Sequence, residues 1–85
     1  MSSYPKIKSV VPLSEKRLRV TFVSGDIKIY DCNPLISEDV FASLKDDVFF
    51  KNAHVDSAGY GVVWNDDVDL SEAELWINGV VEQRN

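Results

Sequence analysis

Apolar and polar residues alternate most regularly between residues 17 and 31, in the stretch RLRVTFVSGDIKIYD. Leu18, Val20 and Phe22 alternate with polar residues, and Ile27 and Ile29 resume the alternation after Gly25. A period of two residues is typical of β-strands, and a short connection that contains glycine is typical of a hairpin turn. This stretch therefore predicts an antiparallel hairpin.

Three further runs predict strands. Residues 7–11 form an apolar-rich run that ends before Pro12, whose missing amide donor suits the end of a strand. Residues 53–56 and 62–64 flank a Ser-Ala-Gly-Tyr-Gly connection, which predicts a second hairpin. The chain should therefore contain a first strand followed by two hairpins.

Helical spacing begins between the hairpins, in LISEDVFASLKDDVFFK. Val40, Phe41 and Leu44 lie three and four residues apart and so share one helical face. Ser37 is expected to cap the amino end of this central helix, and Lys45 suits its carboxyl end.

Two more capping signals follow. Asp46 or Asp47 is expected to cap a short turn that presents residues 48–50 to the core, although three adjacent apolar residues fit a strand as well. Ser71-Glu-Ala-Glu is a capping box, in which the first and fourth residues bond one another's backbone, and it predicts a helix that Gly79 ends.

Length and composition favour a single α+β domain. A chain of 85 residues, 45% hydrophobic and 27% charged, is a size that one core serves. We expect one antiparallel sheet of about five short strands, with the central helix and the C-terminal helix packed on it. The single domain should span residues 1–85, with a core over about residues 4–79 and a short tail at 80–85.

Cysteine usage and hydropathy favour a cytoplasmic protein. Cys32 is the only cysteine, so no internal disulfide forms, as is usual in a reducing compartment. The N-terminal residues lack the apolar run of a signal peptide, and no segment is long and apolar enough to span a membrane. The prediction is a cytoplasmic location without membrane association.

No set of residues predicts catalysis, a cofactor or a metal. The carboxylates between Asp66 and Glu74 lack the glycine and glutamate positions of a calcium-binding EF-hand, and a turn followed by a helix start explains them. The one histidine, His54, has no predicted nucleophile beside it, and Cys32 is expected to be a small apolar filler. The four glycines are too scattered for a phosphate loop, so an enzyme is not expected.

Charge is distributed unevenly along the chain. Residues 1–36 carry six basic and three acidic side chains, whereas residues 37–85 carry three basic and eleven acidic ones, within a net charge of -5. Ordinary solubilising charges are the simpler explanation of this asymmetry, and an interaction surface is the alternative. If it is an interaction surface, the partner is expected to be another protein, and the contacts we select are Asp39, Asp46, Asp47, Glu72 and Glu74.

Two alternatives stay open. If Leu18, Val20 and Phe22 face inward, the hairpin is expected to present a cationic face, formed by Arg17, Arg19, Lys28 and Tyr30. Such a face is used to bind RNA or single strands, but one tyrosine is little for base stacking, and an acidic molecule repels phosphates. Val80 and Val81 could instead form an apolar tail that pairs with a second copy of the chain.

The order of these features resembles the family called domain of unknown function 2442, small bacterial proteins that often stand alone. The resemblance lies in Ile7 and Val10, LRVTFVSGDIKIYD, Phe41 and Leu44, Phe49 or Phe50, GVVW, and VDLSEAELW with Asp69, Leu70 and Leu75. It implies a small α+β fold and supplies no catalytic or ligand residues. Members of this family are encoded beside another gene, in arrangements proposed to be toxin–antitoxin pairs. The resemblance therefore implies a partner from a neighbouring gene, and the acidic second part of the chain favours a basic small protein as that partner. Some members carry an added helix-turn-helix domain.

Overall fold

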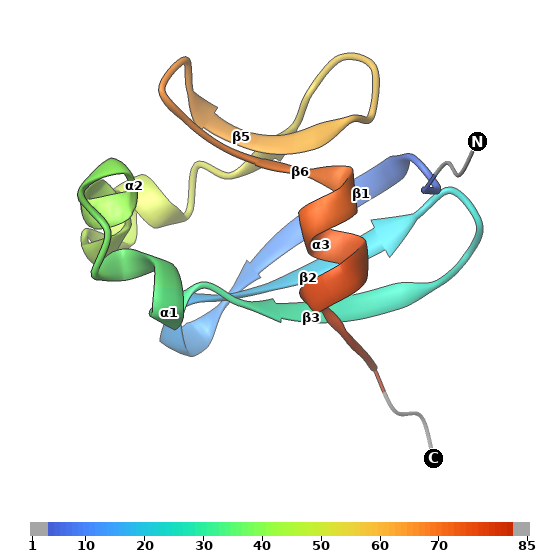
Figure 1. The fold of residues 1–85 in the computed structure, drawn as a ribbon, viewed down its shortest axis with the longest axis horizontal. Helices are drawn as coiled ribbons and strands as arrows, with labels where there is room; N and C mark the ends of the chain where they lie inside the picture. The colour runs from blue at the N-terminus through green and yellow to red at the C-terminus, as the bar shows by residue number, and fades with distance from the viewer. Residues whose placement is uncertain (1–3, 83–85) are drawn as a thin grey trace.

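The computed structural model describes residues 4–82, which form two antiparallel sheets and several short helices (Figure 1). In chain order the elements are β1 (Ile7–Leu13), the 3₁₀ turn η1 (Ser14–Lys16), β2 (Arg17–Phe22), β3 (Ile27–Asp31), α1 (Asn33–Ile36), the 3₁₀ segment η2 (Asp39–Lys45), α2 (Asp47–Phe50), β4 (His54–Val55), β5 (Gly61–Asn65), β6 (Val68–Ser71), α3 (Glu72–Asn78) and β7 (Val80–Val81). The α+β class is confirmed, with two sheets in place of the single sheet expected.

The larger sheet has the strand order β1-β2-β3-β7 and contains the predicted hairpin. Strand β1 continues through Pro12 to Leu13, so the expected end at Pro12 is wrong. Pro12 is tolerated because β1 is an edge strand, whose free side has no ladder bond to lose. The tail expected at residues 80–85 is also wrong for its first part, because Val80 and Val81 pair with β3; residues 83–85 lie outside the described part.

The smaller sheet has the order β4-β5-β6 and contains the second predicted hairpin, together with a strand that the sequence did not predict. The side-chain oxygen of Asn65 accepts hydrogen bonds from the amides of Asp67 and Val68, both at 2.9 Å, and so reverses the chain. In β6, buried Val68 and Leu70 alternate with exposed Asp69. Asp69 therefore lies in a strand and not at a helix start.

The predicted central helix, from the cap at Ser37 to Lys45, is the 3₁₀ segment η2, with the separate short helices α1 before it and α2 after it. Ser37 ends α1 and does not cap a helix, because Glu38 is extended (ψ 139°) and interrupts the helical path. Asp46 is also extended, and its carboxylate accepts from the amide of Val48 at 2.9 Å, which confirms it as the cap of α2. Phe50 reaches the core as expected, whereas Val48 is 75% exposed.

Helix α3 begins and ends at the predicted residues. The hydroxyl oxygen of Ser71 accepts from the Glu74 amide at 3.1 Å, and the Gly79 amide donates to the Leu75 carbonyl at 3.0 Å. The reciprocal half of the capping box is replaced, because the Glu74 carboxylate accepts from the hydroxyl of Tyr30 at 2.7 Å. This bond ties α3 to the larger sheet.

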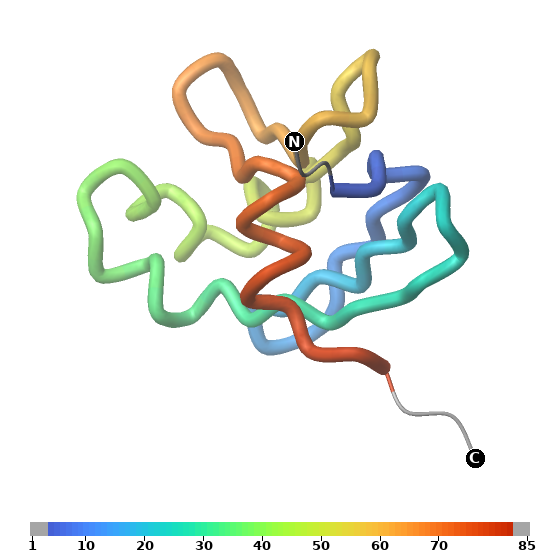
Figure 2. The backbone as a smooth tube through the Cα atoms, turned by 45° about the vertical axis from the view of Figure 1, so that its right-hand side comes forward, coloured from blue at the N-terminus to red at the C-terminus, as the bar shows by residue number. Residues whose placement is uncertain are grey.

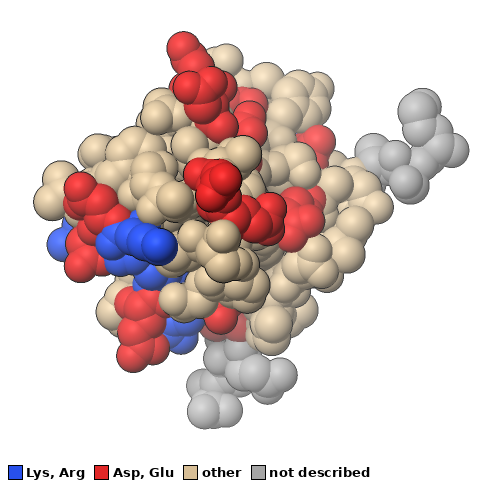
Figure 3. All heavy atoms as spheres, turned by 60° about the vertical axis from the view of Figure 1, so that its left-hand side comes forward, with Lys and Arg blue, Asp and Glu red and all other residues tan. Residues whose placement is uncertain are grey.

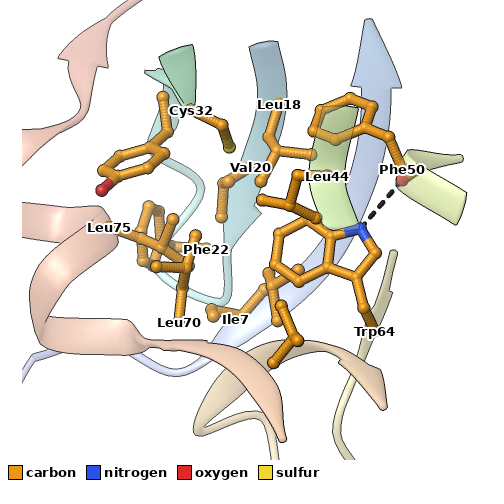
Figure 4. Packing of buried hydrophobic residues seen from close by; sticks show 13 residues of the cluster. Ile7, Leu18, Val20, Phe22, Cys32, Leu44, Phe50, Trp64, Leu70 and Leu75 are labelled. Carbon is orange, nitrogen blue, oxygen red and sulfur yellow. Dashed lines mark hydrogen bonds between the residues drawn. The ribbon is translucent and has the colours of Figure 1, made fainter. Parts of the chain in front are cut away.

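The core lies between the two sheets and α3, whose backbone paths are drawn in Figure 2 and whose buried side chains are drawn in Figure 4. The Trp64 indole donates to the Phe50 carbonyl at 2.9 Å, which fixes α2 against β5. The Ile7 amide donates to the Gly59 carbonyl at 2.8 Å and joins the sheets. Gly59 has φ +80°, and a Cβ there would lie 3.0 Å from the Ile7 oxygen, so this junction requires glycine.

Candidate interaction surfaces

The five acidic residues selected from the sequence lie in two separate regions. Asp39, Asp46 and Asp47 belong to the segment between β3 and β4, whereas Glu72 and Glu74 belong to α3. Three of them have intramolecular roles, since Asp46 caps α2, Asp47 pairs with a lysine and Glu74 binds Tyr30. Figure 3 shows acidic groups dispersed over one face and mixed with basic groups at one side. Their role as partner contacts stays a prediction.

The partner of Asp47 is Lys16, which lies in the turn between β1 and β2. The hydrogen bond and charge of Lys16 hold the pKa of Asp47 below its usual value. Glu15 and Lys16 both adopt left-handed backbone angles, with φ 62° and 59°, which are costly for residues with side chains. The turn is held in place because the Cys32 amide donates to the Lys16 carbonyl at 2.9 Å.

The predicted cationic face of the hairpin is wrong in its arrangement. Tyr30 lies opposite Leu18, and Lys28 lies opposite Val20. Directly opposed residues of an antiparallel pair share a face, so both side chains point to the core side. Tyr30 is 4% exposed there, and the Lys28 ammonium lies 3.9 Å from the centre of the Trp76 ring. Only Arg17 and Arg19 point to the opposite side.

That opposite side is the open sheet face, which no described element covers. The register places on it Ser9, Val11, Leu13, Arg17, Arg19, Thr21, Ile27, Ile29, Asp31, Val80 and Glu82. None of these side chains is buried, whereas the core residues of β2 are fully buried on the other side. The four-stranded sheet therefore has one packed face and one free face.

One row of residues crosses the open sheet face from edge to edge. The register places Val11 beside Arg19, Arg19 beside Ile29, and Ile29 beside Val80. Val11 is 47% exposed and Val80 is 70% exposed. The Arg19 guanidinium binds the Glu82 carboxylate at 2.8 Å, which neutralises the charge within the row. The row is therefore mainly apolar, on a face that polar side chains usually cover.

An edge groove of approximately 620 Å³ lies where β3 extends beyond β7. Strand β7 pairs with Lys28 and Ile29 only, so no described strand lies beside Tyr30 and Asp31 on that side. The lining residues are Arg17, Ile29, Tyr30, Asp31, Pro34, Leu35, Glu74, Asn78, Val80, Val81 and Glu82. The edge groove therefore combines apolar side chains with three carboxylates and one guanidinium.

The wall of the edge groove is ordered by hydrogen bonds. The Glu74 carboxylate accepts from the Tyr30 hydroxyl at 2.7 Å and from the Asn78 amide at 2.9 Å. Burial, together with the hydrogen bond and charge of Glu74, raises the pKa of Tyr30 above its usual value. Tyr30 is therefore a neutral donor that fixes the position of Glu74 at physiological pH.

The nucleophile and base candidates do not form a catalytic pair. Cys32 is fully buried, and burial raises its pKa to about 12, so its thiol stays protonated at neutral pH. His54 is exposed in β4, with its Nδ1 atom 2.9 Å from the Asn52 carbonyl oxygen. Within residues 4–82, no group of three metal-ligating side chains converges, and no helix is long and apolar enough to cross a membrane.

Comparison with known proteins agrees with this α+β architecture and identifies the family. Residues 7–80 match the family model described as "Protein of unknown function (DUF2442)", and the chain belongs to this family. The chain is also similar to a solved structure from Nitrosomonas europaea, named "Putative DNA Binding Protein NE0471", with 28% sequence identity and a TM-score of 0.66. That match covers 79% of this chain and 45% of the other, so this chain corresponds to less than half of that protein's length. Comparison with curated proteins finds no match.

Proposed function

We propose that this chain is a non-enzymatic module that binds another protein through the open sheet face. The observation that carries the proposal is the row of Val11, Arg19, Ile29 and Val80, which presents apolar side chains on a sheet face without a covering layer. Exposed apolar groups within a polar surround are typical of protein interaction sites. Complete burial of Cys32 keeps this thiol from acting as a nucleophile, which agrees with the non-enzymatic part of the proposal.

The charge of the chain favours a basic partner. The net charge is -5, and opposite charge on the partner speeds encounter and sets specificity. Asp39 and Glu72 suit this long-range role, because no hydrogen bond or ion pair of the described residues engages their side chains. The specific form of the proposal is a pairing with a basic small protein from a neighbouring gene, in a toxin–antitoxin or regulatory arrangement.

Purification of the tagged full chain from its source cells tests the proposed function. At about 0.15 M salt, where exposed charges more than about 8 Å apart are largely screened, we expect a basic small protein to remain bound. We also expect the neighbouring gene product to impair growth when it is expressed alone, and co-expression of this chain to relieve the effect. Recovery of the chain by itself, with no effect of co-expression on growth, contradicts the proposal.

Nucleic-acid binding in the cytoplasm is the second candidate function. It is favoured by the name of the similar Nitrosomonas europaea protein and by Arg17 and Arg19 on the open sheet face. Two observations weaken this candidate function. Lys28 and Tyr30 do not lie on the cationic face, and its two arginines have acidic neighbours, since Arg19 binds Glu82 and Asp31 lies opposite Arg17. Gel-shift measurements at low salt separate the candidates, since micromolar chain should leave DNA and RNA unshifted if protein binding is its function.

A further inference from the structure

The edge groove has a composition suited to a particular kind of ligand. Its apolar lining comes from three directions: Ile29 from β3, Leu35 from α1, and Val80 and Val81 from β7. Carboxylates of Asp31, Glu74 and Glu82 also line the groove; the Arg19 guanidinium pairs with Glu82, which leaves Asp31 and Glu74 against the guanidinium of Arg17. A ligand that fits must therefore offer an apolar side chain with positive charge next to it.

The backbone beside the groove suits an extended ligand. Strand β7 is the last strand of the larger sheet, and its side away from β3 has no described neighbour. Val80 is 70% exposed and Val81 is 58% exposed, so the edge is accessible. An unpaired edge strand accepts an incoming strand through main-chain hydrogen bonds, while adjacent pockets select its side chains.

We propose that the edge groove receives an extended segment of the basic partner, which lies along β7, inserts one apolar side chain between Leu35 and Val81, and places flanking lysine or arginine side chains on Asp31 and Glu74. This inference rests on the proposed function, because it names the part of the partner that this chain recognises. The Tyr30 hydroxyl holds Glu74 in the position that receives the cation.

Charge disfavours the other occupants. A second copy of the chain would bring the same carboxylates, Asp31 and Glu74, to the edge groove, and like charges repel across such a contact. A nucleic acid would bring phosphates to the same carboxylates. A cationic and apolar segment is the ligand that matches both properties of the lining.

Peptide binding measured by fluorescence anisotropy tests this inference. The probe is a labelled Lys-Leu-Lys-Val-Lys peptide, with Lys-Ser-Lys-Ser-Lys and Glu-Leu-Glu-Val-Glu as comparisons. Asn78→Lys adds a positive charge to the groove wall at the end of α3, where a cation suits the helix, and Ile77→Lys adds the same charge one residue away, outside the groove. Ile77 is 60% exposed, so this control tolerates the change.

We expect the Lys-Leu-Lys-Val-Lys peptide (the Lys-Leu peptide) to bind the wild-type chain. The two comparison peptides should bind at least about tenfold more weakly, since one lacks the apolar side chains and the other lacks the positive charge. Asn78→Lys should weaken the Lys-Leu peptide about tenfold and Ile77→Lys less than about twofold. Equal binding of the three peptides, or equal effects of the two lysine variants, overturns the inference. If the purified partner still binds the Asn78→Lys chain at wild-type strength, the groove assignment fails while the proposed function stands.

Discussion

The two faces of the larger sheet differ although the same strands form both. On the core side, Leu18, Val20 and Phe22 of β2 are completely buried. On the open sheet face, Arg17, Arg19 and Thr21 of the same strand are partly exposed. Strict alternation along one strand thus gives one face that determines stability and another that is free to bind, and each face should respond to substitution in its own way.

Phe22→Ala should give the largest effect, because it breaks the packed face. Phe22 is fully buried, and its ring meets the Trp76 ring edge-on at a centroid distance of 5.0 Å. Replacement by alanine should lower the free energy of unfolding by about 3–5 kcal/mol, measured by urea denaturation. Val23→Ala is the matched control, since Val23 is 66% exposed, and it should change stability by less than about 0.5 kcal/mol. Similar losses at both positions would contradict the assignment of the packed face.

Trp64→Phe should have the next largest effect. The change removes the indole N–H donor and leaves the Phe50 carbonyl without this partner in the core. We expect a loss of about 1–3 kcal/mol, measured in the same way. Trp76→Phe is the comparison and should cost less, because phenylalanine keeps the edge-on contact with Phe22. The reverse order would show that the bond to Phe50 does not fix α2.

Tyr30→Phe removes the hydroxyl that joins the packed face to α3. Loss of its bond to Glu74 should lower stability by about 1 kcal/mol at neutral pH. The raised pKa of Tyr30 means that the folded chain keeps the phenol proton to higher pH than the unfolded chain. The wild-type contribution should be complete below about pH 10 and lost as the pH rises through the folded pKa, and Tyr30→Phe should reduce this alkaline dependence. If the free energy of unfolding falls equally with rising alkaline pH in the wild-type and Tyr30→Phe chains, the assigned role of the Tyr30 hydroxyl is contradicted.

Val11→Gln should have the smallest effect on stability, because it alters only the open sheet face. Val11 is 47% exposed, and a neutral glutamine places no charge opposite Arg19. We expect a change of less than about 0.5 kcal/mol in the free energy of unfolding, by urea denaturation. A loss comparable to that of Phe22→Ala would show that an element covers this face after all.

The sequence predicted the elements whose signals are local. The alternation around Gly25 predicted the larger hairpin, Ser71 predicted the start of α3, and Asp46 was one of two residues selected as a cap. These signals depend on a few adjacent residues, but the equally local cap signal at Ser37 failed, because Ser37 ends α1 and Glu38 is extended.

The errors arose where pairing between strands decides the outcome. Lys28 and Tyr30 were expected on the outer face, but the hairpin register places Tyr30 opposite buried Leu18 and turns Ile27 and Ile29 to the open sheet face instead. A shift of one residue exchanges the two faces of a strand, and the turn rather than the local pattern sets the register. Strand β6 was missed for a similar reason, because only its pairing with β5 separates it from the acidic turn before it.

The candidate sites could not be predicted fully from the sequence for the same reason, because the sites depend on which distant segments of the chain meet. The edge groove joins residues from β3, α1, α3 and β7, and no spacing in the sequence indicates that these segments meet. The acidic run of residues 66–74 appeared as one feature, yet it is divided among a turn, a strand and a helix. Charge counted along the chain therefore did not predict charge on a surface.

The most direct test compares the affinity of the purified partner for Val11→Gln and for Val48→Gln by isothermal titration calorimetry. Both valines are exposed, but Val11 lies in the row on the open sheet face and Val48 lies on α2. We expect Val11→Gln to weaken binding about tenfold, equivalent to about 1.4 kcal/mol, and Val48→Gln to leave the affinity within about twofold of wild type. Wild-type affinity of the folded Val11→Gln chain would contradict the claim that this face binds the partner.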